Sequence, residues 1–108
     1  DHPIEDIVNI LHHSELYIGV SSGLAWLSWA IKKPVVMISG FSSEWTEFSS
    51  KITRIINKNV CNSCFNNHKL DAGDWDWCPS HKNTPRQFEC TKKISPEIVI
   101  EGVISSLV

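Results

Sequence analysis

Four cysteines within thirty residues are the feature that most constrains how this chain can fold. They are Cys61, Cys64, Cys78 and Cys90, and the chain has no others. Only two residues separate the first pair, so both sulfurs can reach one ion from a tight turn; gaps of thirteen and eleven residues follow. The spacing predicts a single metal ion held by four thiolates.

The residues between these cysteines could not build a hydrophobic core. The segment is rich in Asn, Ser, Lys, His and Asp, and its few large apolar residues follow neither a helical nor a strand period. Ordering the backbone costs about 1–2 kcal/mol per residue. A structural ion offsets that cost, since zinc binds small finger peptides with about 10–16 kcal/mol. Sulfur ligands suit zinc and iron alike, so we expect one structural Fe or Zn ion.

Two alternatives for the cysteines remain open at this point. An even number of cysteines also permits two disulfides, although the rest of the chain has the composition of an ordinary core-forming protein. His68 or His81 could replace one thiolate, but beside four cysteines each is expected at the surface or in a supporting position. Five basic residues against four acidic ones in the segment predict surroundings that favour ionised thiolates.

Composition places the whole chain among globular proteins. It has 108 residues, of which 42% are hydrophobic and 20% charged, enough for one domain plus an insertion. A net charge of −2 without a basic stripe is unlike a nucleic-acid-binding protein. No apolar run approaches the roughly eighteen residues of a membrane span. The start Asp1-His2-Pro3 lacks a methionine, and we expect a piece of a longer protein.

Periodicity predicts alternating helices and strands. Apolar residues at Ile4, Ile7, Val8 and Leu11 predict an amphipathic helix from Pro3 to about residues 13–14. Short apolar runs at 16–20, 35–39 and 52–56 predict strands, and residues 24–31 between the first two predict a helix. Strand, helix and strand in this order indicate a parallel sheet.

A closing helix is predicted at the end of the chain. Ser95 can cap it and Pro96 can occupy its first position. Five apolar residues of this helix are available for burial: Ile98, Ile100, Val103, Ile104 and Leu107. The fold class is therefore α/β, a Rossmann-like half-domain with a four-cysteine metal finger. We expect a sugar-nucleotide-binding part at 1–60, the finger at 61–92, and a helix at 93–108 that packs back on the sheet.

The carboxyl ends of the first two strands are the expected ligand site. Parallel sheets bind ligands there, and both ends are rich in Gly and Ser. Ser21, Ser22, Gly23 and Leu24 lead into a helix, whose first backbone N–H groups and dipole favour an anion such as a diphosphate. The alternative is a plain capped helix start.

The loop after the second strand offers groups for a sugar or nucleotide. Glu44 and Glu47 could accept hydrogen bonds from sugar hydroxyls, while Gly40 and Phe41 begin the loop. Trp26 lies one turn into the neighbouring helix and could reach the same ligand. A solvated turn with one buried aromatic residue is the alternative interpretation.

Read together, these motifs resemble the ADP-heptose heptosyltransferases of the GT-B fold. The run from Gly19 to Trp26 is similar to their sugar-nucleotide turn: Ser22, Gly23 and Leu24 match, whereas Ser21 and Trp26 replace the family's acid and histidine. Residues 38–48 and 60–65 resemble, more narrowly, the bacterial heptosyltransferases that glycosylate autotransporter adhesins and carry a four-cysteine iron finger.

The resemblance implies a function for the chain as a C-terminal, donor-binding part. The enzyme would transfer heptose from ADP-heptose to serine residues of an adhesin, with inversion, in the bacterial cytoplasm. The general base would lie in an N-terminal domain, so no catalytic residue is expected here and this part alone would be inactive. The resemblance also implies that the finger supports a homo-oligomer.

Three other functions are kept open. A lipopolysaccharide-type heptosyltransferase would share the donor site and differ in its acceptor. A metal-stabilised interaction module without catalysis would need only the finger and a capped helix. Rubredoxin-like electron transfer ranks last, because it requires two C-x2-C pairs and the chain has one.

Overall fold

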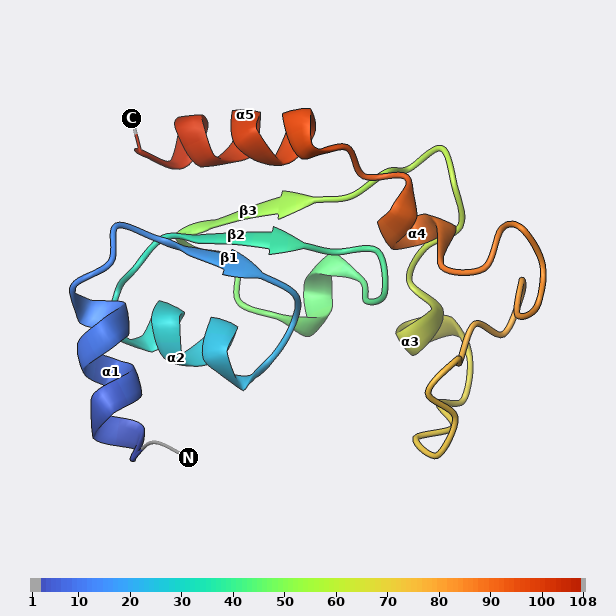
Figure 1. Cartoon of the computed structure of the whole chain (residues 1–108), viewed down its shortest axis with the longest axis horizontal. Coiled ribbons are helices and arrows are strands. Elements are labelled where there is room, and N and C mark those ends of the chain that lie inside the picture. The colour runs from blue at the N-terminus through green and yellow to red at the C-terminus, as the bar shows by residue number, and fades with distance from the viewer. Residues whose placement is uncertain (1–2, 108) are drawn as a thin grey trace.

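A three-stranded parallel sheet with helices on both faces forms the body of the protein (Figure 1). The computed structural model describes residues 3–107, so the expectation for Asp1 and His2 lies outside the described residues. The strands are β1 (Tyr17–Gly19), β2 (Val35–Ile38) and β3 (Ile52–Ile55), in the order β1-β2-β3. All three predicted strands and the α/β class are thereby confirmed.

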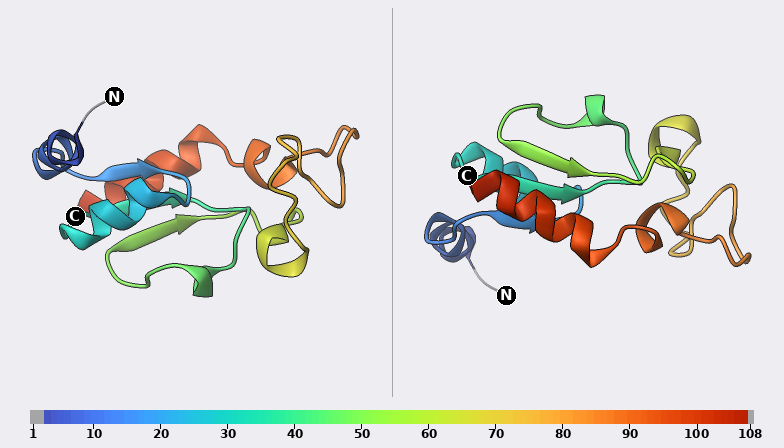
Figure 2. Two further views of the ribbon diagram at one scale, coloured as in Figure 1. Left: turned by 90° about the horizontal axis from the view of Figure 1, so that it is seen from below. Right: turned by 90° about the horizontal axis from the view of Figure 1, so that it is seen from above.

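The helices divide between the two faces of the sheet. α1 (Ile4–His12) packs against α2 (Gly23–Ala30), and α2 packs against β1 and β2. α5 (Pro96–Leu107) covers the opposite face, over β2 and β3, as the two turned views in Figure 2 show. None of the helices in the described residues has the length and apolar character that a bilayer crossing requires.

The core forms where β2 is enclosed on both sides. Val35, Val36 and Met37 are completely buried, as a central parallel strand requires. Val35 and Met37 pack with Ala25 of α2 and with Phe48, and Tyr17, Trp29 and Ile52 border this cluster.

The closing helix leaves most of the apolar residues that are available for burial partly exposed. Ser95 caps α5 as expected, since its hydroxyl accepts the Ile98 N–H at 3.3 Å. However, Gly102 is the buried residue of the helix, and Ile98, Ile100, Ile104 and Leu107 are each about half exposed. Gly102 allows close approach, because a Cβ built on it would lie 2.8 Å from Ile55 Cδ1.

The segment after β3 leaves the sheet at its carboxyl end and forms a separate lobe (Figure 1). It contains two short helices that the sequence pattern did not predict, α3 (Cys64–Asn67) and α4 (Glu89–Lys92). A 3-10 turn, η1 (Glu44–Thr46), lies in the loop between β2 and β3.

Replacement of Met37 by alanine tests the core. Met37→Ala should lower the free energy of unfolding by about 2–5 kcal/mol, since it empties a completely buried site. Urea denaturation measures this change. Ile18→Ala on β1 is the control, because Ile18 is 48% exposed, and equal losses for the two variants would contradict the described core.

Candidate functional site

The turn between β1 and α2 has the geometry of an anion site. Ser22 is extended and caps α2, with its Oγ accepting the Ala25 N–H at 3.4 Å. Tyr17 Oη lies 3.3 Å from the same Oγ. The first N–H groups of a helix have no partner inside it, so those of Gly23 and Leu24 can bind a ligand. A Cβ built on Gly23 would meet nothing within 4 Å, which leaves the approach to these groups open.

The structure divides the predicted ligand residues between two neighbouring hollows. Ser21, Gly40 and Phe41 line a cavity of about 240 Å³, here called the strand-end cavity, bounded by residues 20–21, residues 38–42 and Thr91. Ser22, Gly23, Leu24 and Trp26 border a shallower apolar groove along α2. Ser21 and Ser22, neighbours in the predicted anion-binding turn, therefore line different hollows.

Trp26 belongs to an aromatic cluster behind the turn. Its ring lies 5.0 Å from that of Phe48 and 5.8 Å from that of Trp29, both edge to face. Trp29 and Phe48 stack on each other at 5.2 Å. Trp26 remains 43% exposed, so it both supports α2 and presents a ring face beside the turn.

Glu47 is not free to bind a sugar, because it is committed to a buried ion pair. Its side chain is 3% exposed, and its Oε1 accepts bonds from Arg54 Nη1 and from Ser42 Oγ, both at 3.0 Å. Arg54 Nη2 also donates to the Ser42 carbonyl at 3.1 Å and to Ser39 Oγ. Glu44, by contrast, is exposed on η1 and stays a candidate for ligand contact.

Arg54 is a residue that the sequence analysis missed. It is the charged residue in the otherwise apolar and β-branched run of β3, and a charge on a strand that borders the core needs a buried partner. That signal was available from the sequence. Its partners Ser39, Ser42 and Glu47 follow β2 directly or lie on the loop after it, so Arg54 fixes this loop on the sheet.

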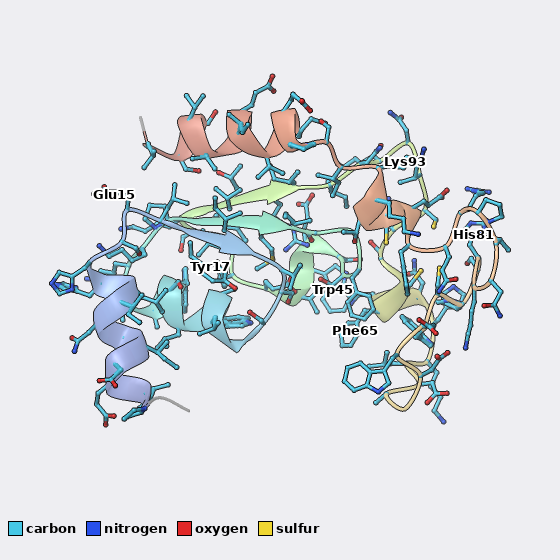
Figure 3. All side chains as sticks on the ribbon, viewed as in Figure 1. Glu15, Tyr17, Trp45, Phe65, His81 and Lys93 are labelled. Atoms are coloured by element: carbon cyan, nitrogen blue, oxygen red, sulfur yellow. The ribbon has the colours of Figure 1, made fainter. Side chains whose placement is uncertain are left out.

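The four cysteines are free thiols that line one cavity of about 430 Å³. Phe41, Trp77 and Phe88 form part of its wall. The helices α3 and α4, which carry Cys64 and Cys90, each follow a residue in the left-handed region, Ser63 (φ 64°) and Phe88 (φ 60°). Such conformations cost about 1–3 kcal/mol and are typical of functional turns. Figure 3 shows Phe65 of α3 near the end of the sheet and His81 in the outer loops of the lobe.

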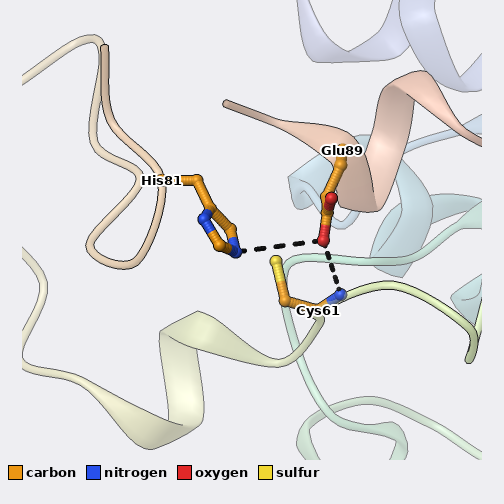
Figure 4. Close-up of side chains that lie close together, drawn as sticks. All are labelled: Cys61, His81 and Glu89. Carbon is orange, nitrogen blue, oxygen red and sulfur yellow. Dashed lines mark hydrogen bonds and ion pairs between the residues drawn. The ribbon is translucent and has the colours of Figure 1, made fainter. Parts of the chain in front are cut away.

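Glu89 links the two halves of the cysteine segment (Figure 4). The residue is 5% exposed, and its carboxylate accepts the Cys61 N–H at 3.0 Å and two bonds from Arg86, from Nε at 2.7 Å and Nη2 at 2.8 Å. The Arg86 guanidinium, and then the Cys61 N–H, lower the pKa of Glu89 to about 2. His81 Nε2 lies 4.0 Å from the same carboxylate.

Cys61 and Cys64 lie in surroundings that favour the protonated thiol, whereas net charge alone predicted the thiolate. Burial, and then the neighbouring Glu89, raise the pKa of Cys61 to about 11. Burial and the proximity of Cys90 and Cys78 raise the pKa of Cys64. The Arg86 guanidinium is paired chiefly with Glu89, which together with the weaker attraction to Cys61 raises the pKa of Arg86. A divalent cation would reverse this balance, since it binds thiolates and displaces their protons.

The donor set fits a borderline or soft metal ion. Four sulfur atoms around one cavity are the ligands that iron and zinc share. The thiol of Cys61, a ring nitrogen of His81 and a carboxylate oxygen of Glu89 also lie within 4.8 Å of one another. A mixed set that includes His81 is therefore a second arrangement, and the four-cysteine set stays a prediction.

Comparison with known proteins identifies relatives along nearly the whole chain. No family model matches it. It is 49% identical over 107 residues to the autotransporter heptosyltransferase BAHTCr of Citrobacter rodentium, covering 97% of this chain and 26% of that protein. It is 47% identical, with the same coverage, to the autotransporter heptosyltransferase TibC of Escherichia coli O78:H11. A relative from Burkholderia thailandensis, BimC, is 42% identical over 99 residues, covering 90% of this chain and 23% of BimC, and is named an inactive autotransporter heptosyltransferase.

The fold agrees with a solved relative. The chain superposes on the crystal structure of the dodecameric, iron-containing TibC in complex with ADP-D-β-D-heptose, with a TM-score of 0.89 at 41% identity. The match covers 98% of this chain and 29% of the TibC chain. By fold and sequence, the relatives of this chain are glycosyltransferases. More narrowly, the chain is related to the autotransporter heptosyltransferases, and this confirms the resemblance that the sequence indicated. The chain spans about a quarter of the length of these relatives.

A double-mutant cycle tests the Arg54 network. Arg54→Met should destabilise the protein by about 3–5 kcal/mol, because it leaves the Glu47 carboxylate buried without a cation. The double variant Arg54→Met/Glu47→Gln should lose less than the sum of the two single variants, as residues in direct contact do. Urea denaturation of all four proteins gives the coupling energy, and strict additivity would show that the pair does not hold the loop.

Proposed function

We propose that this chain is the donor-binding and metal-carrying part of an enzyme that transfers heptose from ADP-heptose to serine residues of a bacterial autotransporter adhesin, with inversion. One observation carries the proposal: the chain superposes at a TM-score of 0.89 and 41% identity on TibC, a heptosyltransferase crystallised with ADP-D-β-D-heptose. The names of two relatives at 47–49% identity support the same activity.

In this proposal the start of α2 binds the donor diphosphate. The N–H groups of Gly23 and Leu24 point to the diphosphate, and Ser21 adds a hydroxyl at its side. When the bond from the sugar to the diphosphate breaks, negative charge grows on the departing ADP. Fixed N–H dipoles and the helix dipole stabilise that charge without having to reorient. The base that activates the acceptor serine lies outside this chain.

The finger holds one structural ion in the proposed function. Cys61, Cys64, Cys78 and Cys90 are the ligands, and the description of TibC as iron-containing supports iron over zinc. When bound, the ion cross-links the segments that carry α3 and α4. Glu89 supports the same junction through Cys61 N–H, and its ion pair with Arg86 neutralises its charge beside the thiolates.

The proposal also covers the oligomeric state of the protein, its cellular compartment and the three parts of the chain. TibC is dodecameric, so we infer a homo-oligomer for the protein that contains this chain. Transfer to an adhesin before its export places the enzyme in the bacterial cytoplasm. The division into a nucleotide-sugar part at 1–60, a finger at 61–92 and a closing helix at 93–108 follows the change from sheet to finger and back.

A non-catalytic module is the second candidate, because a specific observation favours it. BimC shares 42% identity with this chain and is named inactive. Sequence similarity in this segment therefore does not by itself guarantee transfer. Donor binding separates the two candidates, since only an enzyme needs ADP-heptose.

Metal analysis with ligand variants tests the finger. Protein purified without added zinc should contain one iron ion per chain by mass spectrometry, and Cys78→Ser and Cys90→Ser should lose it, since each removes a sulfur ligand. His68→Ala is the control and should retain the ion. His81→Ala distinguishes the two arrangements: retention supports four cysteines, and loss supports the mixed set with Cys61 and Glu89. Four freely reactive thiols without any ion would refute the finger.

Calorimetric titration with ADP-heptose tests the donor site. Gly23→Val should weaken binding by about tenfold or more, equal to about 1.4 kcal/mol, because the new side chain enters the open space in front of the N–H groups. Folding should be unaffected, since a Cβ at Gly23 meets nothing within 4 Å.

Gly73→Val is the matched control for this titration. Gly73 lies in an exposed turn of the finger, and a Cβ there makes only an ordinary contact, 3.4 Å from Asp71 Oδ1. This variant should bind ADP-heptose like the unmodified protein. If the unmodified protein binds no donor, the transferase proposal fails and the module remains.

A further inference from the structure

The finger is hydrogen-bonded directly to the loop after β2, which lines the strand-end cavity. The Ser63 N–H donates to the Gly40 carbonyl at 2.8 Å, and the Phe65 N–H donates to the Phe41 carbonyl at 2.9 Å. In the opposite direction, the Ser43 N–H donates to Asn66 Oδ1 at 2.5 Å. Three hydrogen bonds therefore join α3 and the residue before it to residues 40–43.

The part of the finger around Cys90 contacts the same loop. A Cβ built on Gly40 would lie 2.5 Å from the Cys90 carbonyl oxygen and 2.7 Å from Cys90 Cβ, so only glycine fits between them. The ring of Phe41 lies 5.3 Å from that of Phe65 and 5.6 Å from that of Trp77. Both halves of the finger are thus packed on the loop after β2.

Thr91 is a residue of the finger that lines the strand-end cavity. It follows Cys90 on α4 and lines two cavities, the strand-end cavity together with Ser21 and the cavity of the four cysteines. Two other hydroxyls of the strand-end cavity, those of Ser39 and Ser42, are buried and bonded to Arg54 and Glu47. Thr91 and Ser21 are exposed. Thr91 Oγ1 lies 3.9 Å from Cys90 Sγ, and it has no closer side-chain partner among the described residues.

We propose that Thr91 is a donor-binding residue, so that the cysteine finger forms one wall of the nucleotide-sugar site. The inference rests on the proposed function. In this proposal the Thr91 hydroxyl donates a hydrogen bond to an oxygen of the diphosphate, and Ser21 contacts the diphosphate from the opposite side. The finger then has two tasks, since it holds the structural ion and presents a ligand-binding hydroxyl through the residue next to Cys90.

Titration with ADP tests this proposal, with the metal content of every variant measured in parallel. Thr91→Val should raise the Kd for ADP about tenfold or more, since a hydrogen bond to a charged group contributes about 1.5–3 kcal/mol and each 1.4 kcal/mol is tenfold. Its metal content should equal that of the unmodified protein. Thr91→Ser keeps the hydroxyl and should bind ADP normally. Thr84→Val is the matched control, because Thr84 lies in the finger outside the cavity.

The other outcomes overturn the proposal in distinguishable ways. If the unmodified protein binds ADP and Thr91→Val binds it equally well, Thr91 is not a donor ligand, although the proposed function stands. If Thr91→Val loses metal together with affinity, or if Thr84→Val weakens ADP binding equally, the residue acts through the finger rather than on the ligand. If the unmodified protein does not bind ADP, the proposed function and this inference fail together.

A second measurement does not require any variant to fold. When Thr91 couples the donor site to the finger, each ligand changes the equilibrium affinity for the other by the same factor. ADP should therefore shift the equilibrium distribution of metal between the unmodified protein and a competing chelator toward the protein, which absorbance at the metal-thiolate band follows. An unchanged distribution at saturating ADP would show that the finger and the donor site are independent, which overturns the proposal.

Discussion

The bonds of Arg54 to the loop after β2 are the interaction on which both candidate sites depend. A guanidinium on β3 holds the Ser42 carbonyl and the Glu47 carboxylate, and so fixes residues 40–48 at the carboxyl end of the sheet. Residues of that loop line the strand-end cavity, and the finger is hydrogen-bonded to the same loop. An ion pair this well buried is not strongly stabilising in itself, but breaking it leaves a charge without a partner. It therefore acts chiefly to allow one conformation of the loop.

The finger shows how local pairing can outweigh net charge. Its excess of basic residues suggests stabilised thiolates, yet Arg86 and Lys82 are each paired with a nearby carboxylate, of Glu89 and Asp74 respectively. The thiols are left with burial and with one another, and the pKa of Cys61 and of Cys64 rises. The proposed metal site would resolve this balance, because a bound cation supplies the positive charge that four thiolates require.

Much of the sheet could be predicted from the sequence, and rather less of the site. The strands, the cap at Ser95 and the turn at Ser22 follow from local patterns that act over a few residues. The roles of Glu47 and Glu89 could not be predicted, because their partners Arg54 and Cys61 lie seven and 28 residues away and only the folded chain brings them together. The sequence also did not indicate that Gly102 would be the buried residue of α5. The small residue Gly102 lies against β3, where larger apolar side chains would hold the helix too far away.

The sequence by itself determined the kinds of element, the relationship to the autotransporter heptosyltransferases, and the four sulfur atoms available to an ion. These depend on residue type and spacing, which the chain carries without folding. Only the tertiary structure decided that the finger is packed against the loop after β2, that Glu47 is buried rather than facing a ligand, and that Thr91 lines the strand-end cavity. Those features depend on contacts between distant segments, and the parallel pairing of β2 with β1 and β3 sets the positions from which these contacts form.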